Sequence, residues 1–331
     1  MTLLDVAARL AQGRFRLDAK FVAPGDGITA LFGPSGSGKS TLLSVLAGLK
    51  RCDGYVRLGA RALADSGSHL HLAPHRRGIG VVFQYARLFP HLTARANIAY
   101  AWKRAPEKAR PDICDVARFF DITAQLDRPV GNLSGGEKSR VALARAVAGA
   151  PDFLLLDEPF AALDGARRHA FIQVLLAMHE TYRLPMMVVT HDIDDAAMLA
   201  SHLVALNEGR VVAFGPFADV SLQPEFRRLL DDRDAGVAMP ARHLRTVRGG
   251  QSLWLRADQV LLATERPRAI SARNVLQGEV LAVTAEASGG MLIELSTPEG
   301  IILSRVTPDA VADLGLVAGC KAWALIKAHP L

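Results

Sequence analysis

A glycine-rich turn near the N-terminus has the residues needed to hold phosphate groups. Gly33–Ser40 reads GPSGSGKS and fits the pattern GxxxxGK[ST]. Its glycines let backbone N–H groups turn inward, and Lys39 can reach the β- and γ-phosphates of a nucleoside triphosphate. A strand predicted over Gly27–Phe32 and a helix predicted over Lys39–Ala47 supply the context that such a turn requires. The expected nucleotide contacts are Gly33, Pro34, Ser35, Gly36, Ser37, Gly38, Lys39, Ser40 and Thr41.

Two acids end a second apolar run. Phe153–Leu156 predicts a buried strand, which places Asp157 at its carboxyl end. There an acid can hold Mg²⁺ through water, together with the Ser40 hydroxyl. Glu158 follows directly and can polarise an attacking water as a general base. The pair therefore indicates magnesium-dependent hydrolysis of the nucleotide.

A third segment, LSGGE at 133–137, combines a helix cap with two glycines. Ser134 followed three residues later by Glu137 is a capping box, and an apolar stripe continues the predicted helix to Ala148. Gly135 and Gly136 in the first turn cost about 1 kcal/mol each relative to alanine. They suit a backbone that must approach an anion closely at the positive end of the helix dipole.

The segment LSGGEKSR resembles the signature of ABC ATPases. The resemblance implies that Ser134, Gly135 and Gly136 contact ATP held by a partner subunit, so that a head-to-tail homodimer sandwiches two ATP molecules. It implies three further roles: Gln84 senses Mg²⁺ and the membrane partner, Asp164 couples the two sites, and His191 contacts the γ-phosphate. Glu158, His191 and Gln84 are then the expected catalytic residues, and Ser40, Gln84 and Asp157 the expected magnesium ligands. Phe15 is the candidate for stacking on adenine, and equally a candidate strand core residue.

Two regions suggest what the ATPase drives. The segment 77–100, with ARLFPHL at its centre, resembles the ATPases of bacterial importers for molybdate and related oxyanions. In such importers this region lies under the membrane permease. The segment SARNVL at 271–276 resembles the opening of a molybdate-binding domain of the Mop/TOBE type. A hydroxyl and two cations suit a tetrahedral dianion, and the oxyanion candidates are Ser271, Arg273, Asn274 and Lys327. The alternative is a small β domain that only contacts the other protomer.

The pattern of apolar and polar residues changes along the chain and predicts two domains of different fold class. Residues 1–232 alternate apolar runs and helical stretches, which indicates an α/β domain with a mainly parallel sheet and an inserted helical subdomain over 101–126. The resemblance to ABC ATPases implies that this is a P-loop ABC ATPase domain. Residues 233–266 form a linker and a β segment that is shorter than in the family. Residues 267–331 carry short alternating segments, which predict a small β-barrel-like domain. The resemblance of residues 271–276 implies that this domain is of the Mop/TOBE type.

Composition and charge limit the partners and the cellular location that we expect for the protein. The net charge of +6 is scattered, and the densest basic stretch, 242–248, contains no aromatic residue for base stacking, so we expect no nucleic-acid partner. No run approaches the roughly 18 apolar residues of a membrane-spanning helix. The N-terminus lacks a basic region before an apolar core, so no signal peptide is expected. Three cysteines without a CxxC pair favour a reducing cytosol.

These observations predict the energy-coupling ATPase of a molybdate import ABC transporter. The expected cofactors are ATP and Mg²⁺, with molybdate as a ligand of the C-terminal domain. The expected partners are a second copy, integral-membrane permease subunits and, indirectly, a substrate-binding protein, with the chain peripheral to the cytoplasmic face of the cell membrane. One alternative is an importer ATPase for another anion or a metal (tungstate, sulfate, iron). Another is a soluble ABC ATPase acting on nucleic acid, although such proteins usually carry two cassettes or long coiled coils, and this chain has one cassette and no heptad run.

Overall fold

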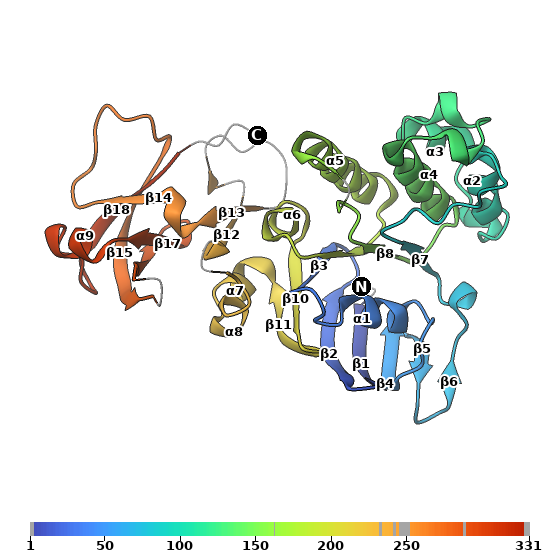
Figure 1. Ribbon diagram of the computed structural model, residues 1–331, viewed down its shortest axis with the longest axis horizontal. Coiled ribbons are helices and arrows are strands. Elements are labelled where there is room, and N and C mark those ends of the chain that lie inside the picture. Colours follow the sequence, from blue (N-terminus) through green and yellow to red (C-terminus); the bar gives the residue numbers. More distant parts are fainter. Residues whose placement is uncertain are drawn as a thin grey trace. The chain divides into compact units, whose positions relative to one another are not determined.

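The most apolar runs of the chain lie side by side in an eleven-stranded sheet of the computed structural model (Figure 1). β3 (Ile28–Phe32) pairs in parallel with β9 (Met186–Thr190) on one side and with β10 (His202–Asn207) on the other. β8 (Phe153–Asp157) and β7 (Ile79–Val82) continue the parallel part beyond β9. β3 and β9 are buried along their whole length, as expected for parallel strands covered on both faces. The residues that follow β3, β8 and β9 therefore meet at one edge of the sheet.

The structure describes residues 3–161, 163–231, 234–240, 243–244, 252–286 and 289–327. The chain divides into two compact units. The first comprises residues 1–191 and 202–214, and the second comprises residues 192–201 and 215–331. In the described ranges, no helix combines the length and the apolar character needed to cross a membrane.

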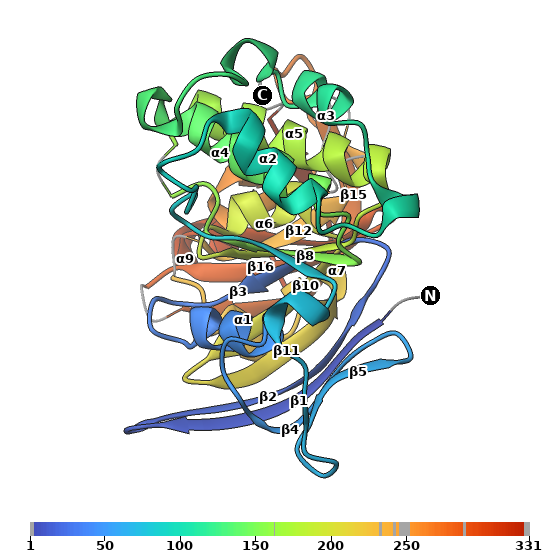
Figure 2. The same ribbon diagram turned by 90° about the vertical axis from the view of Figure 1, so that its right-hand side faces the viewer.

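The other edge of the large sheet consists of antiparallel strands, which differs from the expectation of a mainly parallel sheet. β1 (Leu3–Gln12) and β2 (Phe15–Pro24) form a long hairpin, and β1 also pairs with β4 (Asp53–Leu58) (Figure 2). β5 (Arg61–Asp65) and β6 (Leu70–His71) extend this edge, while β11 (Arg210–Pro216) lies between β2 and β10. The prediction of a mainly parallel sheet is right for β10, β3, β9, β8 and β7, and β11 also pairs with β2 in parallel. The antiparallel strands bury alternate residues, as β2 does, and present no continuous apolar run.

The helices of the first unit follow the strands that position the nucleotide motifs. α1 (Lys39–Leu46) follows β3, and α5 (Gly165–Tyr182) precedes β9. α2 (Ala94–Trp102), α3 (Ile113–Phe119) and α4 (Gly135–Ala148) gather in one group (Figure 1). This group is the predicted helical insertion, but it begins at α2, where the Thr93 hydroxyl accepts from the Ala96 N–H, rather than at residue 101. Short 3-10 turns cover Pro74–Arg76, Glu107–Ala109, Thr123–Gln125 and Val130–Asn132.

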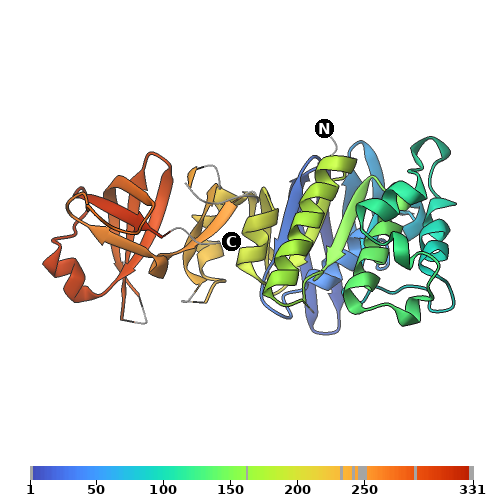
Figure 3. The same ribbon diagram turned by 90° about the horizontal axis from the view of Figure 1, so that it is seen from above.

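The second unit contains a curled five-stranded antiparallel sheet in the order β14–β18–β15–β16–β17 (Figure 3). The Ser304 hydroxyl on β17 donates to the Val260 carbonyl on β14 at 2.7 Å, which joins the last strand to the first and makes a half-barrel. The predicted barrel-like domain is confirmed. Its elements are β14 (Val260–Ala263), β15 (Asn274–Ala285), β16 (Met291–Thr297), β17 (Gly300–Val306), α9 (Pro308–Asp313) and β18 (Lys321–Ile326).

Before the half-barrel, the second unit holds a smaller assembly. A two-stranded sheet pairs β12 (Gly236–Pro240) with β13 (Ser252–Arg256), and the 3-10 turn Ala257–Gln259 leads on to β14. The helices of this part are α6 (Ile193–Leu199), α7 (Phe217–Ser221) and α8 (Pro224–Arg227). β12 and β13 both lie within residues 233–266, the stretch expected to hold a linker and a short β segment. Most of the basic stretch 242–248 and the glycine pair after it lie outside the described residues.

Candidate functional site

The glycine-rich turn between β3 and α1 has a backbone that only glycine adopts without strain. Gly36 and Gly38 have φ values of 82° and 105°, in the left-handed region. A Cβ on Gly38 would lie 2.5 Å from Cζ of Phe15, and a Cβ on Gly33 would lie 2.1 Å from the Leu206 carbonyl oxygen. The turn is therefore pressed between neighbouring chain segments and leaves no room for side chains at these two positions.

The Lys39 side chain folds back onto the glycine-rich turn. Its Nζ donates to the carbonyls of Gly33 at 2.7 Å and Pro34 at 2.9 Å, and the side chain is buried. Burial lowers the pKa of Lys39, against the opposing effect of the Glu158 and Asp157 carboxylates. A buried ammonium held only by carbonyl oxygens is well prepared to exchange them for phosphate oxygens.

A pocket of about 410 Å³ opens over this turn. Its lining brings together predicted residues from separate motifs: Phe15, Ser35, Gly36, Gly38, Lys39, Ser40, Thr41 and Glu158, with Gln12 in addition. Gly33, Pro34 and Ser37 lie in the turn but not in this lining. Phe15 lines the pocket and also packs against the hydrophobic core, as a strand core residue would.

Gln12 is the pocket residue that the sequence reading missed. It ends β1 and pairs with Phe15 across the two-residue turn of the hairpin. The Lys50 ammonium donates to the Gln12 side-chain oxygen at 2.5 Å. The sequence does hold a signal for this hairpin, because Gly13 lies in a turn between two alternating segments. A hairpin there places Gln12 and Phe15 opposite each other, next to the turn.

Asp157 and Glu158 lie at the carboxyl end of β8, as predicted. Burial raises the pKa of Asp157, and the neighbouring Glu158 carboxylate raises it further, whereas Lys39 and Arg87 act in the opposite direction. Glu158 has a φ of 43°, which is rare for a residue with a side chain, and its N–H donates to the Val189 carbonyl at 3.1 Å. This strained conformation directly follows the strand, at a position where functional residues often carry strain.

His191 follows β9 and meets Glu158. Its Nδ1 lies 3.5 Å from Oε1 of Glu158, and the histidine side chain is 57% exposed while that of the glutamate is 26% exposed. The parallel pairing of β8 with β9 places Asp157 opposite Val189, so both strands end at the same level. The structure therefore brings the predicted base together with His191, the histidine expected to contact the γ-phosphate, which we call the switch histidine.

Gln84 and Asp164 lie outside the lining of the pocket. Gln84 is exposed and follows β7, which ends at the same sheet edge because Val82 pairs with Leu156. Asp164 caps α5 by accepting from the Arg167 N–H at 3.0 Å. It also pairs with the Arg167 guanidinium at 3.5 Å. In this chain alone, Asp164 is thus a helix cap.

The predicted capping box is present at the start of α4. The Glu137 carboxylate accepts from the Ser134 N–H at 2.7 Å and from the Ser134 hydroxyl at 2.8 Å, and Gln125 donates to its other oxygen at 2.9 Å. These hydrogen bonds lower the pKa of Glu137. A Cβ on Gly135 or Gly136 would meet no described atom within 4 Å. Packing within the described part of the chain therefore does not require glycine at either position.

The oxyanion candidates gather at one end of the half-barrel. Asn274 is buried at the start of β15 and pairs with Ile326 at the end of β18. Lys327 directly follows β18 and Arg273 directly precedes β15, so the antiparallel register brings them to the same end. Ser271, Arg273 and Lys327 are all exposed. The residues that follow Lys327 lie outside the described ranges.

Two family models match separate parts of the chain. A family model for the ABC transporter matches residues 18–161, and one for the TOBE domain matches residues 270–330. The structure of cbiO1 from Clostridium perfringens, titled as part of the ABC transporter complex cbiONQ, superposes with a TM-score of 0.53 at 23% identity and covers 68% of this chain and 92% of that one. The ATP-binding cassette MJ0796, solved as a dimer in a post-hydrolysis state bound to ADP and Pi, gives 0.54 at 26% identity, over 65% and 98% of the two chains. Fold and phosphate turn together define an ATP-binding cassette of the ABC class.

Relatives that match nearly the full length of this chain identify one family within the ABC class. The molybdenum import ATP-binding protein ModC of Rhodospirillum rubrum is 37% identical over 360 residues, covering 99% of this chain and 97% of that protein. ModC of Rhizobium etli is 38% identical over 353 residues, covering 99% and 98%. The chain belongs to this family, the ModC ATP-binding proteins, and the resemblance predicted from the motifs is confirmed.

Proposed function

We propose that this chain hydrolyses ATP to drive molybdate import, as the energy-coupling subunit of an ABC transporter. The observation that carries the ATPase assignment is the Glu158–His191 pair at 3.5 Å, whose glutamate lines the same pocket as Lys39. The molybdate assignment rests on the ModC relatives, which match nearly the whole chain. No separate feature of the described residues favours iron, sulfate or tungstate.

Each side chain of the pocket has a distinct task in hydrolysis. Lys39 leaves the carbonyls of Gly33 and Pro34 and binds the β- and γ-phosphates. Glu158 accepts a proton from the attacking water as general base. His191, whose Nδ1 lies 3.5 Å from the Glu158 carboxylate, orients that carboxylate and contacts the γ-phosphate. Phe15, above Gly38, stacks on the adenine base. Such positioning and charge stabilisation supply most of the catalysis in phosphoryl transfer.

Mg²⁺ fits the donors at this sheet edge. The Ser40 hydroxyl lines the pocket, the Asp157 carboxyl ends β8, and Gln84 follows the neighbouring strand. All three offer oxygen ligands, which Mg²⁺ prefers. Burial raises the pKa of Asp157 and the neighbouring Glu158 carboxylate raises it further, so a cation bound beside these carboxylates would favour the ionised form of Asp157. Bound Mg²⁺ would supply that positive charge and neutralise the phosphate oxygens.

The second half of each site comes from another copy of the chain. Ser134, Gly135 and Gly136 lie at the start of α4 and outside the lining of the chain's own pocket. The open space at both glycines leaves their backbone N–H groups accessible to a phosphate at the positive end of the helix dipole. We therefore infer a head-to-tail homodimer, in which Asp164 lies near the partner's site and couples the two.

The remaining partners follow from the same assignment. Residues 77–100 meet the integral-membrane permease, and a substrate-binding protein acts through that permease. The chain is then peripheral to the cytoplasmic face of the membrane, with residues 1–232 as the ATPase domain, 233–266 as a connecting segment and 267–331 as the Mop/TOBE-type domain. The cluster of Ser271, Arg273, Asn274 and Lys327 binds molybdate there as a regulatory ligand.

Anion-dependent ATP hydrolysis by the assembled transporter tests this function. The chain is purified with its permease and the cognate binding protein, and hydrolysis is measured with molybdate, tungstate or sulfate in turn. Stimulation by molybdate that exceeds stimulation by sulfate supports the proposal. Stimulation by sulfate or tungstate but not by molybdate would assign the transporter to another substrate.

A further inference from the structure

The boundary between the two compact units falls directly after the switch histidine. His191 belongs to the first unit, and the next residue, Asp192, belongs to the second. The second unit thus begins with the short helix α6 (Ile193–Leu199) and resumes at Gly215, after the strand β10. One peptide bond therefore connects a residue of the ATP site to a helix that packs with the C-terminal part of the chain.

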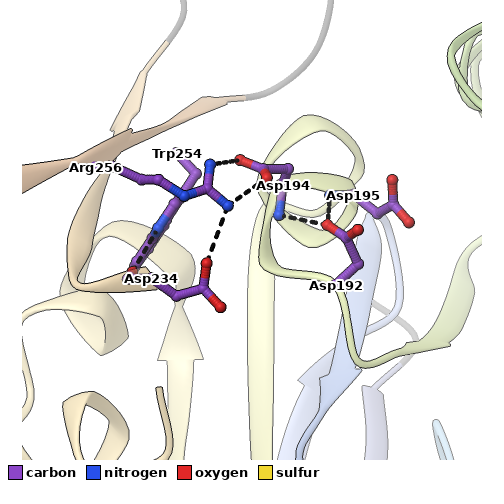
Figure 4. Close-up of polar contacts among 6 residues, drawn as sticks. All are labelled: Asp192, Asp194, Asp195, Asp234, Trp254 and Arg256. Carbon is purple, nitrogen blue, oxygen red and sulfur yellow. Dashed lines mark hydrogen bonds and ion pairs between the residues drawn. The ribbon is translucent and has the colours of Figure 1, made fainter. Parts of the chain in front are cut away.

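The start of α6 is rigid. The Asp192 carboxylate accepts from the backbone N–H groups of Asp194 at 3.0 Å and Asp195 at 3.2 Å (Figure 4). Such an N-cap fixes the direction in which the chain enters a helix. The residue that directly follows His191 is therefore the cap of α6.

An arginine from β13 holds α6 from the C-terminal side. The Arg256 guanidinium donates to both carboxylate oxygens of Asp194, at 2.9 and 2.7 Å, and to the Asp234 carboxylate at 3.0 Å (Figure 4). Two parallel N–H···O bonds fix orientation as well as distance, and only arginine offers this fork. The two carboxylates raise the pKa of Arg256, which stays charged.

Arg256 is itself held in place by a packed platform. Its strand pairs with β12, where Arg256 lies opposite Gly236. The adjacent Trp254 is buried, donates from its ring nitrogen to the Asp234 carbonyl at 2.9 Å and stacks on Phe217 at 6.0 Å. The guanidinium thus projects from a rigid base, so it can transmit the position of the β12–β13 sheet to α6.

We propose that Arg256 is a positioning residue for ATP hydrolysis, which sets the placement of His191 beside Glu158 through Asp194 and helix α6. The inference rests on the proposed roles of Glu158 and His191. It assigns to the C-terminal part of the chain a direct influence on turnover: a change that draws β13 away from α6 would release the backbone that carries His191. ATP binding at the glycine-rich turn does not depend on this contact.

The test compares kcat and KM for ATP among full-length variants. Arg256→Met removes the fork, Asp194→Asn removes its charged acceptor, and the double variant removes both. Arg227→Met is the matched control: Arg227 pairs with Glu294 at 2.5 Å in the same unit, at nearly the same exposure, and that pair does not involve α6. Melting temperature, measured in parallel, identifies any variant that fails to fold.

We expect Arg256→Met and Asp194→Asn each to lower kcat by about tenfold, because small misplacements of a catalytic group carry effects of this size. KM for ATP should stay within about twofold, the double variant should be no worse than the single ones, and Arg227→Met should match the wild type. Arg256→Lys, which keeps the charge without the fork, should fall between Arg256→Met and the wild type.

Wild-type kcat in a folded Arg256→Met variant would overturn the inference, and so would an equal loss in Arg227→Met. If Arg256→Met does not fold, the surface variant Asp194→Asn decides in the same way. Glu158→Gln is measured alongside. If it abolishes turnover while Arg256→Met does not, only the positioning role fails. If Glu158→Gln keeps wild-type turnover, the proposed ATPase mechanism itself fails.

Discussion

Oε1 of Glu158 lies 3.5 Å from Nδ1 of His191, although the two residues follow different strands of the sheet. Parallel pairing of β8 and β9 delivers both residues to one edge, and the left-handed conformation of Glu158 occurs at the first position after its strand. The Glu158 carboxylate, which is largely shielded from solvent, can act as the base, and the exposed His191 imidazole beside it can orient that carboxylate. The proposed mechanism of ATP hydrolysis depends on this pair.

Asp157→Asn should stabilise the nucleotide-free chain at neutral pH while abolishing turnover. The fold raises the pKa of Asp157, so the folded state holds this proton more tightly than the unfolded state does. Below the ordinary pKa of 3.8 both states are protonated and the cost is absent. As the pH rises through the raised pKa the cost appears, and it stays at neutral pH. Urea denaturation should show the variant more stable than the wild type at pH 7, with a difference that shrinks toward pH 4. A variant less stable at pH 7 would contradict this account.

Gly38→Ala should disturb the chain more than Gly36→Ala, although both glycines have positive φ. The conformational strain of about 1–2 kcal/mol is common to both. Only at Gly38 would the new Cβ meet another group, Cζ of Phe15 at 2.5 Å, whereas nothing described lies within 4 Å at Gly36. Fluorescent nucleotide binding and chemical denaturation should both show the larger loss for Gly38→Ala.

Phe15→Ala provides the control for that comparison. In this background, Gly38→Ala should cost no more than Gly36→Ala, because the ring is gone. If the excess cost of Gly38→Ala persists without the Phe15 ring, contact with Phe15 is not its cause.

Gly136→Ala should raise stability and lower activity. The residue lies in the first turn of α4 with open space around its Cα, so alanine should raise the free energy of unfolding by about 0.5–1 kcal/mol. Hydrolysis should nevertheless fall at least tenfold, because a methyl group there would keep the partner's phosphate from the helix N-terminus. Gly165→Ala, at the equally open first position of α5, gives the reference for the stability gain. Full activity in a more stable Gly136→Ala variant would count against the shared site.

Lys327→Ala should weaken molybdate binding by the full-length chain about tenfold, since a charge-assisted hydrogen bond to a dianion is worth about 1.5 kcal/mol or more. Arg273→Ala should act in the same direction. Lys321→Ala removes the same charge from the other end of β18 and should leave binding unchanged. Calorimetric titration with sodium molybdate measures all three variants. Equal effects of Lys321→Ala and Lys327→Ala would indicate net charge rather than a built site.

Continuous apolar runs made the parallel half of the sheet predictable. The strands before Gly33 and Asp157 are buried on both faces, so they stand out from their flanks and fix where each motif lies. The hairpin that presents Gln12 and Phe15 to the pocket was not predicted, because its strands bury only every second residue and one face stays exposed. A weaker, alternating pattern is easily hidden among loops.

The contact between Arg256 and Asp194 could not be predicted from the local sequence around either residue. The two residues are 62 positions apart in sequence, and no pattern of spacing relates one to the other. Their meeting follows from the way α6 leaves the ATPase sheet and packs with the C-terminal part of the chain, which is a property of tertiary structure. The open space around Gly135 and Gly136 likewise required coordinates, although their cost to helix stability was visible from the sequence.

Molybdate accumulation by the reconstituted transporter tests the central claim most directly. Proteoliposomes that enclose ATP and carry the chain with its permease receive the binding protein and molybdate outside. We predict ATP-dependent uptake with the wild-type chain, and loss of uptake by at least 100-fold with Glu158→Gln, which should still bind ATP. Uptake that persists with Glu158→Gln, or wild-type proteoliposomes that take up sulfate but not molybdate, would contradict the account.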